Sequence, residues 1–234
     1  MKLKKKVKRA ILLILLSAIL VIGLLAYLKY SKADVKTVKT IDKIKGYGYV
    51  LKESKPKEYK KMFYELKDIL SKDKVDKEKY AKQISKMFIY DFYSLDDKLA
   101  KTDVGGLDFV YPSVLENFML NAESTYYKYL ESNVYKNRKQ VLPKVTNIKI
   151  ESIDEEEFEY SEITDPNTDK EKEEEKLDEK AYIIEISWDY TDTKFDDYQK
   201  EATLTVVHKG KKLYIAELIN PNEKDTDDDE EEEE

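Results

Sequence analysis

Residues 181–191 read AYIIEISWDYT, and their alternation decides the fold class. Apolar and aromatic side chains recur at every second position, which is the spacing of a half-buried β-strand. The expected inner-face residues are Tyr182, Ile184, Ile186, Trp188 and Tyr190. We interpret this stripe as the inner face of a sheet. The alternative is that Trp188, Tyr182 and Tyr190 line a ligand-binding cavity.

Further strands are predicted on both sides of this stretch. Alternation indicates a strand before it at 145–153 and two strands after it at 200–208 and 212–219. The last two read as a hairpin that turns at Lys209-Gly210. The only histidine, His208, is expected to be exposed at the edge of this hairpin.

The first half of the chain is helical in pattern. Apolar spacing predicts helices at 55–71, 76–93 and 113–132, and a short helix is expected to begin at Ser94 and end at Gly105-Gly106. Helices followed by successive strands, with no helix between those strands, predict an α+β fold in which N-terminal helices pack on an antiparallel sheet. We place this domain at residues 41–220.

Two acidic segments do not fit this pattern. Residues 154–179 are dominated by Glu, Asp and Lys, and we expect a long loop there, with at most a short strand at Phe158 and Tyr160. Residues 221–234 are predicted to be a disordered acidic tail, because such a composition buries too little apolar area to offset the entropy of ordering.

The N-terminal region predicts a membrane anchor. Residues 10–28 form an uncharged run of 19 residues, long enough to span a bilayer. The basic residues 1–9 should stay in the cytoplasm, and 29–40 read as a juxtamembrane linker. The domain would then lie outside the cytoplasmic membrane. The alternative is a secreted form cleaved after Ala33.

Composition limits the chemistry. The chain has no Cys and one His, which excludes thiolate chemistry and makes a His-based triad or metal cluster untenable. The net charge of −7 includes eight basic residues and no acidic residue within 1–33, so the remainder is strongly acidic and should repel nucleic acid. Residues 165–176 resemble a calcium loop only in part, because Lys170 and Lys176 replace its Gly and Glu. We predict no metal and no cofactor.

Three residues in the helical half are candidates for a site. Asp91 lies among aromatic residues, where a carboxyl can have a raised pKa and act as a base. Asp108 and Tyr111 lie in the glycine-containing stretch DVGGLDFVYP, which would either position them at a pocket mouth or simply connect two helices. No spacing of these groups marks a known catalytic motif.

This order of elements behind a single anchor resembles membrane-anchored members of the nuclear-transport-factor-2-like superfamily. Its plan is similar to that of the bitopic scaffold protein of type IV secretion and conjugation systems. The resemblance implies a cone-shaped domain whose curved sheet wraps the helices around a pocket, used by some members for catalysis and by others for assembly.

We therefore predict a single-pass membrane protein that presents a non-enzymatic extracytoplasmic domain for protein assembly or ligand binding. Its protein partners are not identified by the sequence. The alternative is a small-pocket enzyme of the isomerase or hydratase type that uses a carboxylate and a tyrosine.

Overall fold

The computed structural model describes residues 39–163 and 173–221. The expected cytoplasmic tail, anchor, most of the linker and nearly all of the acidic tail lie outside these residues. Within the described ranges, no helix combines the length and the apolar character needed to cross a bilayer. The described residues from Thr40 onward belong to one compact unit.

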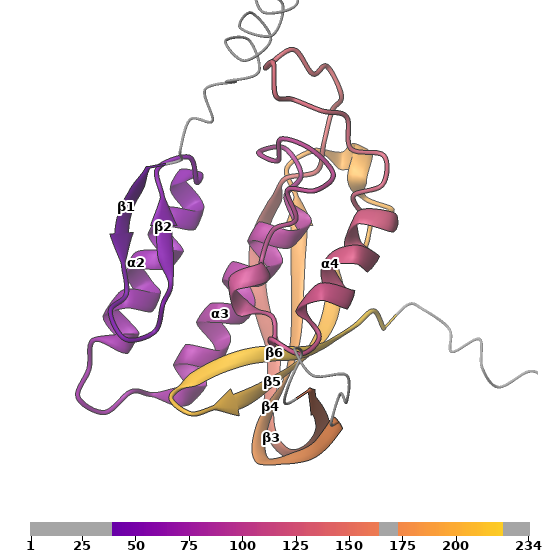
Figure 1. Cartoon of the computed structure of the whole chain (residues 1–234). Coiled ribbons are helices and arrows are strands. Elements are labelled where there is room, and N and C mark those ends of the chain that lie inside the picture. The colour runs from indigo at the N-terminus through magenta and orange to yellow at the C-terminus, as the bar shows by residue number, and fades with distance from the viewer. Residues whose placement is uncertain (1–38, 164–172, 222–234) are drawn as a thin grey trace, which may run out of the picture. The chain divides into compact units, whose positions relative to one another are not determined.

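The fold is α+β, as predicted from a helical first half followed by successive strands (Figure 1). Its helices are α2 (Lys57–Leu70), α3 (Lys77–Tyr93) and α4 (Leu115–Ser124), with short 3-10 turns at Leu107–Phe109 (η1) and Thr193–Phe195 (η2). The curved antiparallel sheet has the order β3-β4-β5-β6, formed by Val145–Ile163, Glu173–Tyr190, Glu201–Lys209 and Lys212–Ile219. A separate hairpin pairs β1 (Thr40–Lys43) with β2 (Val50–Lys52).

Helix α3 is the centre of the core. Asp76 caps its N-terminus by accepting a hydrogen bond of 3.0 Å from the Lys79 N–H. Its apolar positions bury it on several sides, since it contacts α2, β3, β4 and β6. Helix α2 buries Tyr59, Phe63, Leu66 and Leu70. Both helices therefore follow the predicted spacing of apolar residues.

The inner face of β4 is also as predicted. Tyr182, Ile184, Ile186, Trp188 and Tyr190 are all buried. They belong to the same core cluster as the inward side chains of β5 and β6. The aromatic stripe of residues 181–191 is therefore an inner sheet face.

The prediction of a long loop at 154–179 is wrong for residues 154–163 and 173–179, which the structure describes. Strands β3 and β4 continue through most of it as one long hairpin, in which Phe158 pairs with Asp178 and Tyr160 with Lys176. We call residues 154–163 and 173–181 the arm; Figure 1 shows it curling beyond β5 and β6. Phe158 and Tyr160 pack with Tyr111 in a second apolar cluster. The apolar area of these two side chains stabilises the strands, although the segment is otherwise acidic.

Two predicted helices also differ from the structure. No helix begins at Ser94, which instead ends α3, and whose hydroxyl accepts a hydrogen bond from the Val145 N–H at 3.1 Å. Helix α4 ends at Ser124 and not near residue 132. After it the chain turns so that the buried Tyr127 hydroxyl donates to the Phe92 carbonyl at 2.6 Å. Tertiary hydrogen bonds thus replace the helical ones expected from spacing.

Truncating the arm's inner face should destabilise the domain. Phe158→Ala removes partly buried ring area that contacts the second cluster, and we expect a loss of about 1–2 kcal/mol in the free energy of unfolding. Leu177 lies on the adjacent position of the partner strand and is 51% exposed. Leu177→Ala is therefore the control and should change stability by less than about 0.5 kcal/mol. Urea unfolding of both variants measures this, and equal effects would contradict the packing of the arm.

Candidate functional site

Asp91 lies near the end of α3 and is the centre of a buried charge cluster. Its side chain accepts hydrogen bonds from Lys55 at 2.5 Å and from Lys98 at 3.0 Å, both on Oδ1. The other oxygen, Oδ2, accepts from the Gly106 N–H at 2.9 Å. Lys98 is only 3% exposed and also pairs with Asp97 at 2.7 Å. Every oxygen of the Asp91 carboxylate is thus engaged.

The glycine-containing loop closes directly over this cluster. A Cβ atom on Gly105 would lie 1.9 Å from the backbone carbonyl oxygen of Asp91, so only glycine allows this approach. The Gly105 N–H donates to the Tyr127 hydroxyl at 3.1 Å. The sequence left two alternatives for this stretch, a loop at a pocket mouth or a simple connection between helices. In the structure it covers the charge cluster of Asp91.

The electrostatics of Asp91 are opposite to those of a catalytic base. Burial alone would raise the pKa of its carboxyl, but the ammonium groups of Lys98 and Lys55 outweigh burial and lower the pKa to about 2. The expected raised pKa is therefore wrong. At neutral pH Asp91 is ionised, and it links the end of α3 to the 94–106 segment and to the entry to α2.

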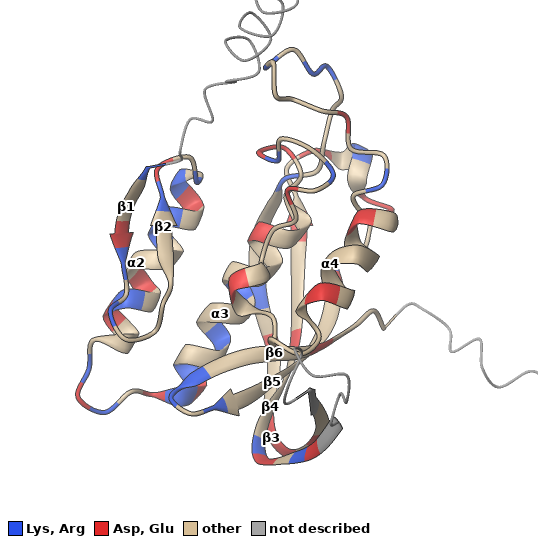
Figure 2. Cartoon of the chain, in the orientation of Figure 1, with Lys and Arg blue, Asp and Glu red and all other residues tan. Residues whose placement is uncertain are grey.

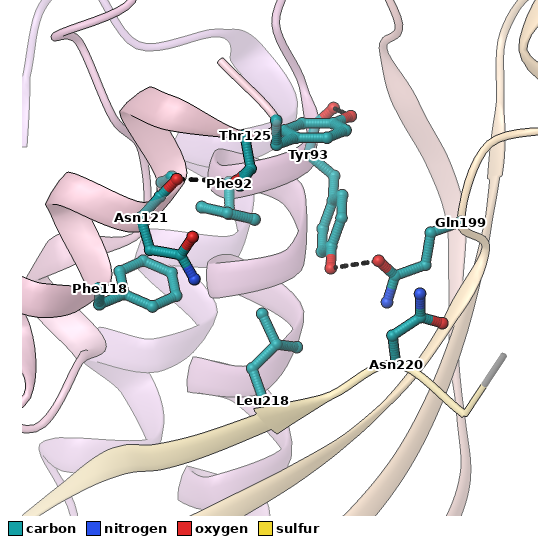
Figure 3. A pocket seen from close by; sticks show the side chains of 10 residues that line it. Phe92, Tyr93, Phe118, Asn121, Thr125, Gln199, Leu218 and Asn220 are labelled. Carbon is teal, nitrogen blue, oxygen red and sulfur yellow. Dashed lines mark hydrogen bonds between the residues drawn. The ribbon is translucent and has the colours of Figure 1, made fainter. Parts of the chain in front are cut away.

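A cavity of about 390 Å³ opens between α3, α4 and the end of β6, and we call it the aromatic–amide pocket. Aromatic side chains and the amides of three elements line it (Figure 3). Its lining residues are Phe92, Tyr93, Phe118, Asn121, Ala122, Thr125, Tyr126, Gln199, Leu218 and Asn220. Figure 3 shows Asn121 and Phe118 on one side of the opening, with Gln199 and Asn220 on the other.

Hydrogen bonds hold Gln199, one of the amides that line the pocket, in place. The Tyr93 hydroxyl donates to Gln199 Oε1 at 3.0 Å. The backbone carbonyl of Gln199 accepts from the Tyr190 hydroxyl at 2.9 Å, and its side-chain amide donates to the Glu201 carbonyl at 2.9 Å. The Tyr126 hydroxyl donates to the Tyr93 carbonyl at 3.0 Å. Gln199 is therefore preorganised, with its orientation set from three directions.

The pocket is suited to binding and poorly suited to proton transfer. None of its lining residues is Lys, Arg, Asp, Glu or His. Burial raises the pKa of Tyr126, which keeps that phenol neutral. Ring faces offer apolar contact while amides both donate and accept hydrogen bonds. This combination fits an uncharged polar ligand, or a protein segment, that presents one apolar face.

The predicted binding residues do not form one site. Trp188 and Tyr190 lie behind the pocket, Trp188 packing its ring 4.5 Å from that of Tyr93. Tyr182 lies against His208, with ring centroids 5.7 Å apart. Tyr111 is buried beneath the arm, and Asp108 is exposed on η1. Desolvation by the surrounding protein and the charge of Asp91 raise the pKa of Asp108, but no tyrosine hydroxyl of the described residues forms a hydrogen bond with its side chain.

Sequence interpretation missed the residues that make the polar wall. Asn121, Gln199 and Asn220 come from α4, the turn before β5 and the end of β6. Isolated amides in three distant segments leave no pattern in a sequence. Phe118, Ala122 and Tyr126 were recognisable as a helical face, but not as the wall of an opening.

His208 is also more engaged than expected. It is partly buried, and its Nδ1 lies 2.9 Å from Asp178 Oδ2, an oxygen that also accepts from the His208 backbone N–H at 2.6 Å. This contact ties the arm to β5. No group of three or more acidic or His side chains in the described ranges is arranged to hold a metal ion.

The charge cluster predicts a specific dependence of stability on pH. The folded-state pKa of Asp91 lies below its ordinary value of 3.8, so its stabilisation is present above pH 4 and is lost as the pH falls towards 2. Asp91→Asn leaves Lys98 buried beside fewer charges and should cost about 3–5 kcal/mol at pH 7. The difference from wild type should shrink by about 2 kcal/mol at pH 2.

Urea unfolding at both pH values measures this difference. Asp73 is exposed and pairs with no charged side chain of the described residues, so Asp73→Asn is the control and should change stability by less than about 0.5 kcal/mol at either pH. A difference between wild type and Asp91→Asn that does not depend on pH would show that Asp91 is not ionised in the folded state.

No protein-family model matches the chain, and no curated protein or solved structure is significantly similar to it. The resemblance to the nuclear-transport-factor-2-like superfamily therefore rests on the order of elements alone and stays a prediction.

Proposed function

We propose that this chain is a single-pass membrane protein whose extracytoplasmic α+β domain acts by binding and not by catalysis. The observation that supports binding most directly is the aromatic–amide pocket, in which hydrogen bonds fix the Gln199 amide and no lining residue is charged. Its ligand would be an uncharged polar molecule or a segment of a partner protein. The pocket between helices and a curved sheet also agrees with the architecture that the superfamily resemblance implies.

The anchor is proposed from residues 10–28. An uncharged run of 19 residues behind six basic residues suits a helix inserted with its N-terminus in the cytoplasm. The absence of Cys agrees with a domain that is exported without disulfides. On this proposal the pocket faces outward from the cytoplasmic membrane.

Filling the pocket should abolish its function without unfolding the domain. The Asn121 side chain is exposed at the opening and makes no hydrogen bond with the described residues, so Asn121→Trp should leave stability within about 0.5 kcal/mol of wild type. We expect this variant to fail to restore a strain that lacks the gene. Thermal unfolding of the purified protein verifies that the variant is folded.

The neighbouring residue provides a matched control. Leu120 is 54% exposed and does not line the pocket, so Leu120→Trp adds the same ring outside it and should restore the strain. If Asn121→Trp restores the strain as well as Leu120→Trp does, the pocket is not the binding site.

The topology is tested on intact cells. Protease added to protoplasts should digest the domain and leave a fragment of the N-terminal region in the membrane fraction, because residues 10–28 would be shielded by lipid. A full-length chain that resists external protease would exclude the proposed orientation. A chain in the medium that begins at Asp34 would instead support the secreted form.

A further inference from the structure

Lysine and tyrosine side chains gather where three segments meet. The Nζ atoms of Lys77, Lys211 and Lys212 lie 5.7, 4.9 and 4.6 Å from the ring centroids of Tyr80, Tyr47 and Tyr49, in that order. Lys212 is also 4.5 Å from the ring of Tyr214. We call these seven residues the Lys–Tyr corner. Figure 2 shows lysines gathered at the turn between β5 and β6.

The corner is a built feature of the fold. Tyr49 and Tyr80 are buried and share a hydrogen bond of 2.6 Å between their hydroxyls. Lys77 Nζ donates to the Lys211 carbonyl at 2.8 Å, which joins the start of α3 to the β5–β6 turn. A Cβ atom on Gly46 would lie 2.6 Å from Lys211 Nζ, so the β1–β2 turn is equally close.

The positive charge of the corner is only partly offset, because the Asp108 carboxylate interacts electrostatically with Lys212. Lys77, Lys211 and Lys212 form no ion pair within the part of the chain that the structure describes. The two acidic residues beside Lys77 are engaged elsewhere, Asp76 with Lys79 at 3.1 Å and Glu78 with Lys82. Burial raises the pKa of Tyr80 to about 12, so that phenol adds no negative charge. In an otherwise acidic domain, the corner is a local cationic surface.

We propose that the Lys–Tyr corner binds the phosphodiester headgroups of an anionic lipid surface. Lysine is a point-charge ligand for phosphate. Tyr47 and Tyr214, the two partly exposed tyrosines of the corner, are amphipathic side chains suited to the interface between water and lipid. Lys211 is exposed beside the Tyr47 ring, so its long stem allows the ammonium group to reach a neighbouring surface. The proposal rests on the proposed anchor.

The length of the linker supports this choice of partner. Residues 29–39 can extend over at most about 40 Å, so an anchored domain stays within reach of the bilayer. Each lysine near an anionic lipid surface strengthens association by about fivefold. Tethering makes such weak contacts effective, because the local concentration of headgroups is high.

The test uses the full chain in lipid nanodiscs. Discs of phosphatidylcholine alone are compared with discs that also contain phosphatidylglycerol, and acetylation of each lysine is followed by mass spectrometry. We expect Lys211 to react about fivefold or more slowly in the anionic discs, and this protection should disappear in 1 M salt. Insertion of the chain into both kinds of disc tests the proposed anchor, whereas protection of Lys211 tests the proposed lipid contact. The two proposals can therefore fail independently.

Variants test whether the effect is local. Replacing two members of the corner, Lys77→Gln with Lys212→Gln, should remove most of the protection of Lys211. The control pair Lys101→Gln with Lys139→Gln removes the same charge from exposed positions outside the corner and should leave that protection unchanged. Equal losses in both pairs would overturn the proposal, because bulk charge would then explain the effect.

Competing anions complete the test. Soluble poly(glycerol phosphate) and a single-stranded oligonucleotide are added to chain held in discs of phosphatidylcholine. Protection of Lys211 by either polymer, without protection in anionic discs, would overturn the assignment to lipid. Unchanged reactivity of Lys211 under all conditions would overturn it as well.

Discussion

The buried contact between Asp91 and Lys98 is the constraint on which the rest of the domain depends. A charge removed from water is tolerated only when opposite charges and hydrogen bonds replace the lost hydration. Asp91 meets this requirement with Lys98 and the Gly106 N–H of the 94–106 segment and with Lys55 at the entry to α2. Those segments cannot move apart without exposing an unpaired buried charge. Phe92 and Tyr93, the next residues on α3, are thereby held in place as the wall of the pocket.

The central helices and the inner sheet face could be predicted because their burial follows a regular period. The 3.6-residue spacing of α2 and the two-residue spacing of β4 record which side of each element meets the core, whereas α3 is buried at nearly every position from Gln83 to Tyr93. The side chains on β4 from Tyr182 to Tyr190 show this most clearly, since every second one is buried. Burial with a regular period can be recognised within a short stretch of sequence.

The arm and the pocket depend on contacts between residues that are far apart in the sequence, and no short sequence pattern predicts such contacts. In the arm, cross-strand pairing proceeds through a run of acidic residues, and Phe158 and Tyr160 are its inward anchors. In the pocket, Gln199 is oriented by Tyr93 and Tyr190 from different elements. Likewise, the aromatic neighbours of Asp91 suggested a raised pKa, whereas the lysines that lower it are 36 and 7 residues away.

Strand β6 connects two surfaces of different chemistry. Lys212 at its start belongs to the Lys–Tyr corner. Leu218 near its end and Asn220 just after it line the aromatic–amide pocket, which has no charged lining residue. A strand rises about 3.3 Å per residue, so the two surfaces are separated by roughly 25 Å. A small ligand cannot reach both. Binding of headgroups at the corner would therefore leave the pocket open, and a domain held at a lipid surface in this way could still present the pocket to a second molecule.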